Sequence, residues 1–349
     1  MLILGIESSC DETAASVVED GRHVRSSVVA SQHEIHEAFG GVVPELASRA
    51  HAERITGVVQ QAIKDAGCEF SDLNAIAVGH RPGLIGALLV GVSAAKSLSW
   101  SLGVPLVGVD HVRAHLWAGL LNTDVGIDDI FPALGLVISG GHSTIFECDS
   151  PTEIQKLGGT IDDAVGEAYD KAAAILGLGH PGGPVVDKLA SDGASDDRAV
   201  DLPVSRLGRE SLDFSFSGLK TALLYEVRGV PGPGGVFPKD NTELTVGRKR
   251  DLCASFQRAA SRAIVLKLER ALDAMGNKPK SLIIGGGVSA NSRIRRDITE
   301  LAQRKSLQLV LPEIRFCVDN AAMIAGLGYH TLQTIGPDDL LLRAAPGMS

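Results

Sequence analysis

The chain has 349 residues, which at roughly 150 residues per domain favours two domains. Hydrophobic residues make up 44% and charged residues 21%, a balance that supports packed cores and excludes an intrinsically disordered chain. The formal net charge of −9 excludes a protein that binds nucleic acid with its whole surface, because phosphate neutralisation needs an excess of positive charge. Contact with RNA would therefore need a local basic patch or the help of a partner.

The first half of the sequence predicts a hairpin followed by alternating helices and strands. The hairpin consists of an apolar strand, Leu2–Ile6, a polar turn, Glu7–Thr13, and a return strand, Ala14–Val18. Alternation of strands with helices is typical of a parallel or mixed sheet that is covered on both faces. The elements that follow the hairpin are expected at Glu45–Ala66 (helix), Ala75–Val78 (strand), Leu84–Leu102 (helix) and Leu106–Val109 (strand).

The second half repeats the design of the first. Strand Leu134–Ser139, a turn at Gly140-Gly141-His142 and strand Ser143–Cys148 form a second hairpin, and we interpret the chain as a duplicated fold with one hairpin per lobe. The Gly/Pro-rich segment Gly229–Asn241 predicts a surface excursion. The remaining expected elements are helices at Asp162–Leu176, Asp251–Met275, after Asn291 and from about Asp319, and strands at Ser281–Ile284 and Leu307–Leu311.

Three glycine-rich turns follow predicted strands, at Gly5–Thr13, Ser139–Ser143 and Gly285–Asn291. Backbone N–H groups at such turns, and at the start of the helix after Asn291, form cradles for phosphate oxygens. We therefore expect a nucleotide-phosphate site between two lobes, although each turn alone would be explained by tight chain reversal. The G-x-x-x-x-G-K-[ST] pattern of a P-loop is absent, and no G-x-G-x-x-G opens a helix.

His111 and His115 lie four residues apart in a helical pattern and so project from one face, where two imidazoles can hold a cation. Asp319 is a candidate third ligand, and the alternative is a pair of helix histidines that face solvent or a carboxylate. A zinc peptidase needs a glutamate after the first histidine as general base, and Val112 occupies that position. The pattern thus favours a metal site other than that of a peptidase.

Acidic and basic runs in the second half leave alternatives open. Asp163, Glu167 and Asp170 or Lys171 recur at helical spacing, so they would either bind ribose hydroxyls or a substrate amine, or form a solvated helix face. Two basic runs are candidate RNA-facing patches or ordinary charged surface: Arg293, Arg295, Arg296, Arg304 and Lys305, and Arg248-Lys249-Arg250.

The five cysteines are scattered without a C-x-x-C pair, which is typical of free thiols in a reducing compartment. The N-terminal segment reaches Glu7 too soon for a signal peptide, and the apolar run Pro82–Ala95 stops at Lys96, short of a membrane span. We expect a cytoplasmic protein without membrane association.

Many of these segments, in order, resemble the tRNA adenosine threonylcarbamoyltransferase family of the TsaD type, once described as glycoproteases. The resemblance covers nearly the whole chain. It is carried by Gly5–Thr13, Phe39–His51, Pro82–Gly91, the His111/His115 pair, Val137–His142, Asp162–Lys171, Phe214–Lys220, Gly286–Asn291 and Asp319-Asn320.

The resemblance implies a two-lobed α/β fold of the actin/Hsp70/sugar-kinase type with duplicated RNase H-like lobes. One lobe would comprise residues 1–115 and about 320–349, and the other about 116–319 with an insertion near 229–241. It further implies that the enzyme moves a threonylcarbamoyl group from threonylcarbamoyl-AMP to the exocyclic amine of the adenosine beside the anticodon in ANN-decoding tRNAs, releasing AMP.

The resemblance also assigns residues and partners. His111, His115 and Asp319 would hold one divalent ion, iron(II) or alternatively zinc. Independently of the resemblance, we expect Asp11 or Glu12, in the first predicted hairpin, to accept the proton of the amine in this reaction. The expected protein partners are an inactive paralogue of the TsaB type and a small ATPase of the TsaE type. The adenylate would be held by Val137, Ile138, Ser139, Gly140, Gly141, Asp170, Gly183, Asp187 and Asn291.

The chain departs from the family where Gly79-His80-Arg81-Pro82 replaces the usual Thr-x-Gly-Pro, so cleft shape or partner contact would differ there. Two alternatives to the transferase stay open at this level. One is an ATPase or small-molecule carbamoyltransferase of the same fold, and the other, disfavoured by Val112, is a metallopeptidase.

Overall fold

The computed structural model describes residues 1–37, 39, 41–239, 244–276 and 278–347. Within these ranges the chain divides into two compact units. Unit 1 comprises Met1–Phe131, Cys148–Ile154 and Val310–Ser349, and unit 2 comprises Pro132–Glu147 and Gln155–Leu309.

Unit 1 is built on a five-stranded sheet in the order β3-β2-β1-β4-β5. β1 pairs antiparallel with β2 and parallel with β4, so the sheet is mixed, as the alternation of strands and helices predicts. Its strands are β1 (Leu2–Glu7), β2 (Glu12–Glu19), β3 (His23–Ser31), β4 (Ala75–Arg81) and β5 (Leu106–Asp110), and its longer helices are α2 (Pro44–Ala66), α3 (Ile85–Leu102) and α11 (Ala321–Thr334). The shorter helices are α1 (His33–Glu37), α4 (His111–Trp117) and α5 (Ile127–Ile130).

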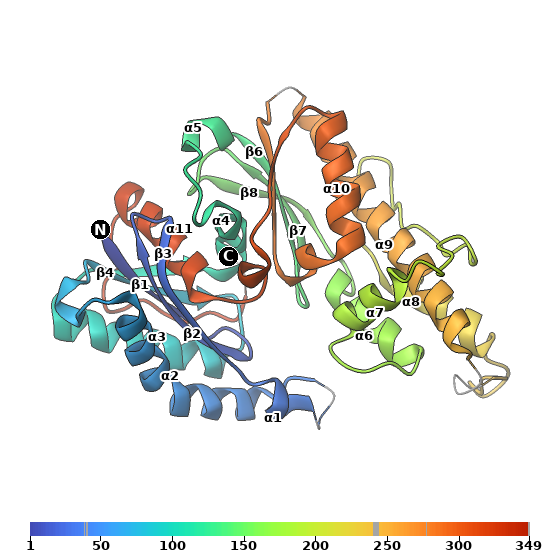
Figure 1. Ribbon diagram of the computed structural model, residues 1–349, viewed down its shortest axis with the longest axis horizontal. Helices are drawn as coiled ribbons and strands as arrows, with labels where there is room; N and C mark the ends of the chain where they lie inside the picture. The colour runs from blue at the N-terminus through green and yellow to red at the C-terminus, as the bar shows by residue number, and fades with distance from the viewer. Residues whose placement is uncertain (38, 40, 240–243, 277, 348–349) are drawn as a thin grey trace. The chain divides into compact units, whose positions relative to one another are not determined.

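Helices cover both faces of this sheet (Figure 1). Leu4 and Ile6 point into an apolar core shared with α2, where Ile55 and Val59 are buried. Gly5 faces the other side, where a Cβ atom would lie 2.2 Å from the Ala321 carbonyl oxygen. A side chain at residue 5 would therefore force α11 away from β1.

Unit 2 repeats the plan with a sheet in the order β10-β9-β6-β7-β8. Counted from its own first strand, this is the same order as in unit 1, so the predicted duplication is confirmed at the level of sheet topology. The strands are β6 (Ala133–Ile138), β7 (Ser143–Cys148), β8 (Ile154–Gly159), β9 (Ser281–Gly285) and β10 (Gln308–Val310). The helices are α6 (Val165–Ile175), α7 (Gly182–Ala190), α8 (Ser217–Arg228), α9 (Val246–Met275) and α10 (Ser292–Arg304).

Most predicted elements are confirmed within five residues, but the sequence does not predict β3, β8, α8 or the short helices α1 and α5. The helix expected from Asp162 begins at Val165, because Ala164 has an extended backbone and Asp162 is bound instead by Phe216 N and Ser215 Oγ. The predicted excursion Gly229–Asn241 lacks helix and strand over its described part, residues 229–239, and its end at Asn241 lies outside the described residues.

The apolar run that was expected to be too short to span a membrane lies in α3. This helix is long and apolar enough to span one by length and composition alone, with a mean hydropathy of 1.4 over 18 residues. The helix continues past Lys96, where the apolar run stops, and ends at Leu102 as predicted. However, one side of α3 packs against α2 and β4 as a layer of the folded unit.

Candidate functional site

The two histidines of unit 1 are presented by a short helix that starts where β5 ends. Asp110, the last residue of β5, caps α4 by accepting hydrogen bonds from Val112 N and Arg113 N, both at 3.1 Å. His111 and His115 follow one turn apart, with ring centroids 4.8 Å from each other and planes at 79°. Val112 is fully buried, so the position of a peptidase's general base holds a core side chain.

Asp319 completes a cluster of three potential metal ligands. Its Oδ1 lies 3.1 Å from His115 Nε2 and 3.6 Å from His111 Nε2, and one ligand atom from each residue lies within 4.8 Å of the others. Asp319 is held there because the next residue, Asn320, caps α11 by accepting from Met323 N at 3.0 Å. The structure thus brings together the three residues that the sequence proposed as ligands.

Glu7 and Ser9, which the sequence analysis placed only in a polar turn, contact the first histidine. His111 Nδ1 lies 2.9 Å from Glu7 Oε2 and 3.2 Å from Ser9 Oγ. With the Nδ1 proton donated to Glu7, the Nε2 lone pair of His111 is left on the side of Asp319. A carboxylate behind a histidine is the usual arrangement around a metal-ligating imidazole, where it fixes the tautomer and raises basicity. The polar residues directly after the first strand were the only sequence signal for this role.

The cluster fits a divalent cation. His115 is fully buried, yet neither ring nitrogen has a hydrogen bond within the described part of the chain. Burial lowers the pKa of His111, but the carboxylates of Glu7 and Asp319 outweigh it and raise this pKa to about 10. A raised histidine pKa indicates an excess of negative charge around the imidazole. A cation bound between the Nε2 atoms of the two histidines and Asp319 would neutralise that charge.

The predicted proton acceptors, Asp11 and Glu12, lie in the turn between β1 and β2 and at the start of β2. Burial raises the pKa of Glu12 to about 9, and the carboxylates of Asp319 and Asp11 add to this. Burial also raises the pKa of the Cys10 thiol, and the carboxylates of Asp11 and Asp319 add to this. Without a cation, Glu12 therefore carries a proton at neutral pH, and positive charge near Asp319 would lower its pKa.

In unit 2 the predicted adenylate residues fall into a backbone group and a side-chain group. The backbone group is the tight turn between β6 and β7, closed by hydrogen bonds from Ser139 N to the His142 carbonyl oxygen at 2.8 Å and from His142 N to Ser139 Oγ at 3.1 Å. The exposed N–H groups of Gly140 and Gly141 have no hydrogen bond among the residues that the structure describes. Val137 and Ile138 are fully buried, so these two residues can offer a ligand only their backbone.

The side-chain group centres on Asp187 and Asn291, which are joined by Gln257. Gln257 Nε2 donates to Asp187 Oδ1 at 2.8 Å, and its Oε1 accepts from Asn291 Nδ2 at 3.2 Å. Ser292 N donates to Asp187 Oδ2 at 3.0 Å, while Asn291 Oδ1 caps α10 by accepting from Ile294 N. Sequence reasoning missed Gln257 because nothing distinguishes it within the long helix α9.

Asp170 and Gly183 belong to the loop that leads into α7. Asp170 Oδ1 accepts from Gly182 N at 2.7 Å, and a Cβ at residue 182 would lie 2.6 Å from Asp170 Cα. This close approach places Gly183 at the first turn of α7, one turn before Asp187.

Asp163 has a different environment from the one expected. It precedes α6 rather than lying on it, and its two oxygens bind Lys171 Nζ at 2.6 Å and Lys220 Nζ at 2.8 Å. The two lysines and their hydrogen bonds, working against burial, lower the pKa of Asp163. The prediction that Asp163 shares one helix face with Glu167 and Asp170 or Lys171 is therefore wrong for Asp163. Its two ion pairs connect α6 to α8 instead.

The departure at His80-Arg81 lies beside α4, which carries His111 and His115. Arg81 Nε is 3.5 Å from Asp110 Oδ2, on the carboxylate whose other oxygen caps α4. His80 Nδ1 lies 3.0 Å from the Arg343 carbonyl oxygen, which ties β4 to the C-terminal segment.

Comparison with known proteins decides the family. The profile described as "TsaD: tRNA N6-adenosine threonylcarbamoyltransferase" matches residues 23–326. The tRNA N6-adenosine threonylcarbamoyltransferase of Trichlorobacter lovleyi is 49% identical over 344 residues, which cover 99% of this chain and 95% of that protein. The Bacillus subtilis protein of the same name is 45% identical over 329 residues, 94% of this chain and 90% of that one. The chain belongs to this family.

Two solved structures share the fold. Full-length HypF has a TM-score of 0.58 at 12% identity, covering 97% of this chain and 47% of that chain. Component A of the Acidaminococcus fermentans (R)-2-hydroxyglutaryl-CoA dehydratase has a TM-score of 0.51 at 13% identity, covering 96% and 100%. These similarities, with the two mixed five-stranded sheets, confirm the expected actin/Hsp70/sugar-kinase-like fold. Family membership makes the chain a threonylcarbamoyltransferase that modifies tRNA.

Proposed function

We propose that this transferase takes its threonylcarbamoyl group from threonylcarbamoyl-AMP and delivers it to the adenosine beside the anticodon in ANN-decoding tRNAs. The N6 amine attacks the carbamoyl carbon, the bond from that carbon to the phosphate oxygen breaks, AMP leaves, and the amine loses a proton. The cluster of His111, His115 and Asp319 carries this proposal, because it combines cation ligands with a buried, negatively charged setting.

We assign His111, His115 and Asp319 as ligands of one divalent ion. Two imidazoles and one carboxylate are a donor set that suits iron(II), our first choice, and also zinc. When bound, such an ion supplies Lewis-acid stabilisation of an oxygen on which negative charge develops. Glu7 holds His111 in the tautomer that leaves Nε2 available, and Asp110 fixes the helix that carries both imidazoles.

We assign the turn Ser139–Gly141 to the phosphate of the adenylate. The N–H groups of Gly140 and Gly141 are exposed, have no hydrogen bond to any described residue, and are donors suited to phosphate oxygens. Asp187 and Asn291 suit the nucleoside, because their acceptor and donor atoms are held in place by Gln257. Val137 and Ile138 position the turn through β6, and Asp170 and Gly183 shape the loop before α7.

The general base is assigned to Asp11 or Glu12. Both lie within two residues of the turn that contacts His111, and the Glu12 carboxyl is close enough to Asp319 to respond to its charge. Loss of a proton from the N6 amine to one of these carboxylates completes the transfer.

We propose that the chain works in the cytoplasm with an inactive paralogue of the TsaB type and a small ATPase of the TsaE type. An exposed apolar stretch on α3 supports a protein partner: the exposed fractions are 46% for Ile85, 51% for Leu89 and 76% for Trp100. Large apolar side chains grouped on one exposed helix are typical of interaction sites.

The test is to incubate the purified chain with synthetic threonylcarbamoyl-AMP and tRNA, with and without a chelator and the two partner proteins, and to analyse the nucleosides. Modified adenosine should form, and should disappear with the chelator and in His111→Ala. Formation of product without tRNA would favour a small-molecule carbamoyltransferase, and a fully active His111→Ala would refute the metal assignment.

A further inference from the structure

Unit 2 carries an arginine-rich groove along α9 and α10, outside the residues assigned to the adenylate. A hollow of about 310 Å³ is lined by six arginines, which we call the arginine groove: Arg198, Arg258, Arg262, Arg293, Arg296 and Arg304. A second hollow of about 470 Å³ shares Arg262 and Arg304 with it and adds Arg206 and Arg270. The two hollows form one continuous surface.

The spacing of the arginines makes the groove long. On α10, Arg296 follows Arg293 by three positions and Arg304 follows Arg296 by eight, so the three arginines lie on one helical face. Arg293 and Arg304 are roughly 16 Å apart along the helix axis. On α9, Arg258 and Arg262 are one turn apart, and the two helices pack side by side (Figure 1). The charges are thus spread over a distance that suits an extended anion rather than a single phosphate group.

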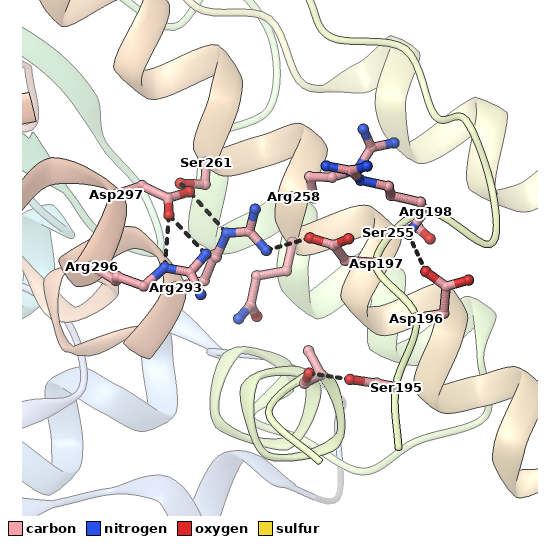
Figure 2. Close-up of polar contacts among 12 residues, drawn as sticks. Ser195, Asp196, Asp197, Arg198, Ser255, Arg258, Ser261, Arg293, Arg296 and Asp297 are labelled. Carbon is pink, nitrogen blue, oxygen red and sulfur yellow. Dashed lines mark hydrogen bonds and ion pairs between the residues drawn. The ribbon is translucent and has the colours of Figure 1, made fainter. Parts of the chain in front are cut away.

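Part of this surface is fixed by internal ion pairs. Arg293 binds Asp197 at 2.7 Å and Asp297 at 2.9 Å, and Arg296 binds Asp297 at 3.0 Å (Figure 2). Arg304 binds Glu269 at 3.0 Å. These contacts hold the groove in shape without cancelling its charge, because Arg296 and Arg304 remain 56% and 59% exposed.

Other arginines of the groove have no internal partner. The guanidinium groups of Arg198 and Arg262 make no hydrogen bond or ion pair within the described part of the chain, and both residues are exposed. The linings of the two hollows together contain eight arginines and four carboxylates, an excess of four positive charges. Exposed Asp201, 3.5 Å from Arg258, reduces the excess to three. Such a concentration is unexpected in a chain of net charge −9.

The side chains that line the two hollows suit the binding of phosphate groups and do not suit the recognition of nucleic-acid bases. Guanidinium groups match phosphate oxygens in geometry and remain charged at all relevant pH values. The lining of both hollows contains no aromatic side chain among the described residues, so the stacking platforms that read single-stranded bases are missing there. The groove is therefore suited to a sugar–phosphate backbone.

The groove also continues towards the residues assigned to the adenylate. A third hollow, of about 570 Å³, is lined by Arg293 and Arg296 together with Gln257 and Ser292. Gln257 and Ser292 both bind Asp187. A polyanion in the arginine groove would thus lie next to the network that holds the proposed nucleoside-binding side chains.

From these observations we propose that the arginine groove binds the sugar–phosphate backbone of the substrate tRNA. The proposal rests on the proposed function, which supplies tRNA as the polyanion. Contacts of this kind position a nucleic acid and add affinity without sequence information. The groove therefore strengthens binding of tRNAs with and without the target adenosine alike.

The test uses the full-length double variant Arg198→Gln/Arg262→Gln, which removes two charges and breaks no side-chain hydrogen bond or ion pair of the described residues. Its affinity for tRNA, measured by fluorescence anisotropy over a range of salt concentrations, should fall about tenfold, and the slope of log K against log[salt] should become shallower by about one to two. Arg25→Gln/Lys64→Gln, on β3 and α2, removes the same charge from unit 1 and should leave both quantities within twofold of the original.

Transfer assays separate this proposal from the proposed function. In the groove variant the KM for tRNA should rise about tenfold, while kcat at saturating tRNA and the KM for threonylcarbamoyl-AMP stay unchanged. Absence of transfer by the unsubstituted chain and its partners would count against the proposed function. If the groove variant transfers normally and keeps its tRNA affinity and salt slope, the groove proposal is wrong and the proposed function stands. The groove proposal is also wrong if the variant binds tRNA normally but no longer binds one of its protein partners.

Discussion

The side-chain amide of Gln257 donates a hydrogen bond to the Asp187 carboxylate, with 2.8 Å between Nε2 and Oδ1. The same amide accepts from Asn291 through its oxygen, so one buried side chain on α9 orients two residues on α7 and before α10. Because Gln257 uses one end of its amide for each partner, neither Asp187 nor Asn291 can turn without breaking a buried hydrogen bond.

Gln257→Met should therefore weaken binding of threonylcarbamoyl-AMP while preserving the volume of the side chain. We expect the KM for the adenylate to rise about tenfold and kcat to change by less than about threefold, since the lost hydrogen bonds orient binding groups only. Steady-state kinetics with saturating tRNA measures both. Gln303→Met, at an exposed position of α10, is the matched control, and an unchanged KM in Gln257→Met would contradict the positioning role.

Glu7→Gln should weaken metal binding although Glu7 is not a ligand. The substitution keeps the size of the side chain but removes the negative charge 2.9 Å from His111 Nδ1, which makes the imidazole a poorer ligand. Loss of such a carboxylate typically costs about 10- to 100-fold in metal affinity. Titration with iron(II) or zinc in chelator-buffered solution measures the affinity. Glu45→Gln, exposed in the first turn of α2, should bind the metal normally, and equal affinity of the two variants would remove Glu7 from the site.

The sequence predicts those parts of the site that depend on local spacing. His111 and His115 share a face because an α-helix completes a turn in about 3.6 residues, and Asn291 caps α10 because it follows a strand and a glycine-rich turn. The antiparallel pair β1–β2 is likewise predicted by an apolar strand, a polar turn and a return strand. In each case the pattern lies within a few residues along the chain.

Roles that arise from contacts between distant segments could not be read in the same way. Glu7 meets His111 across 104 positions of the sequence, and Gln257 meets Asp187 across 70. The spacing of Asp163 to Glu167 predicts a helical position, but Asp163 lies before α6 and binds Lys171 and Lys220. Tertiary contact decides such positions and propensity does not.

Gly5→Ala should destabilise unit 1 and lower its affinity for the metal. The new Cβ would lie 2.2 Å from the Ala321 carbonyl oxygen and 2.9 Å from Ala325 N, so α11 must move, and Asp319 directly precedes that helix. Overpacking of this kind costs about 1–3 kcal/mol or more, which denaturant unfolding would detect.

Gly57→Ala on α2 is the control for Gly5→Ala. Its Cβ meets nothing within 4 Å, and replacing a glycine inside a helix by alanine stabilises by about 0.5–1 kcal/mol. If both substitutions shift the free energy of unfolding in the same direction, the close packing of α11 on β1 is not what excludes a side chain at residue 5.

Asp163→Asn should lower stability at neutral pH and have less effect in acid. Lys171 and Lys220 lower the pKa of Asp163 below its ordinary value of 3.8, so the carboxylate stabilises the fold above that value. This contribution is lost as pH falls through the lower, folded-state pKa. The difference in unfolding free energy between the original chain and Asp163→Asn, about 1–2 kcal/mol at pH 7, should stay constant down to about pH 4.5 and shrink below pH 4.

The control is Glu167→Gln. Among the described residues it breaks only the exposed pair with Lys171, and it should cost no more than about 0.5 kcal/mol. A difference for Asp163→Asn that grows on acidification would contradict the ion pairs as the cause.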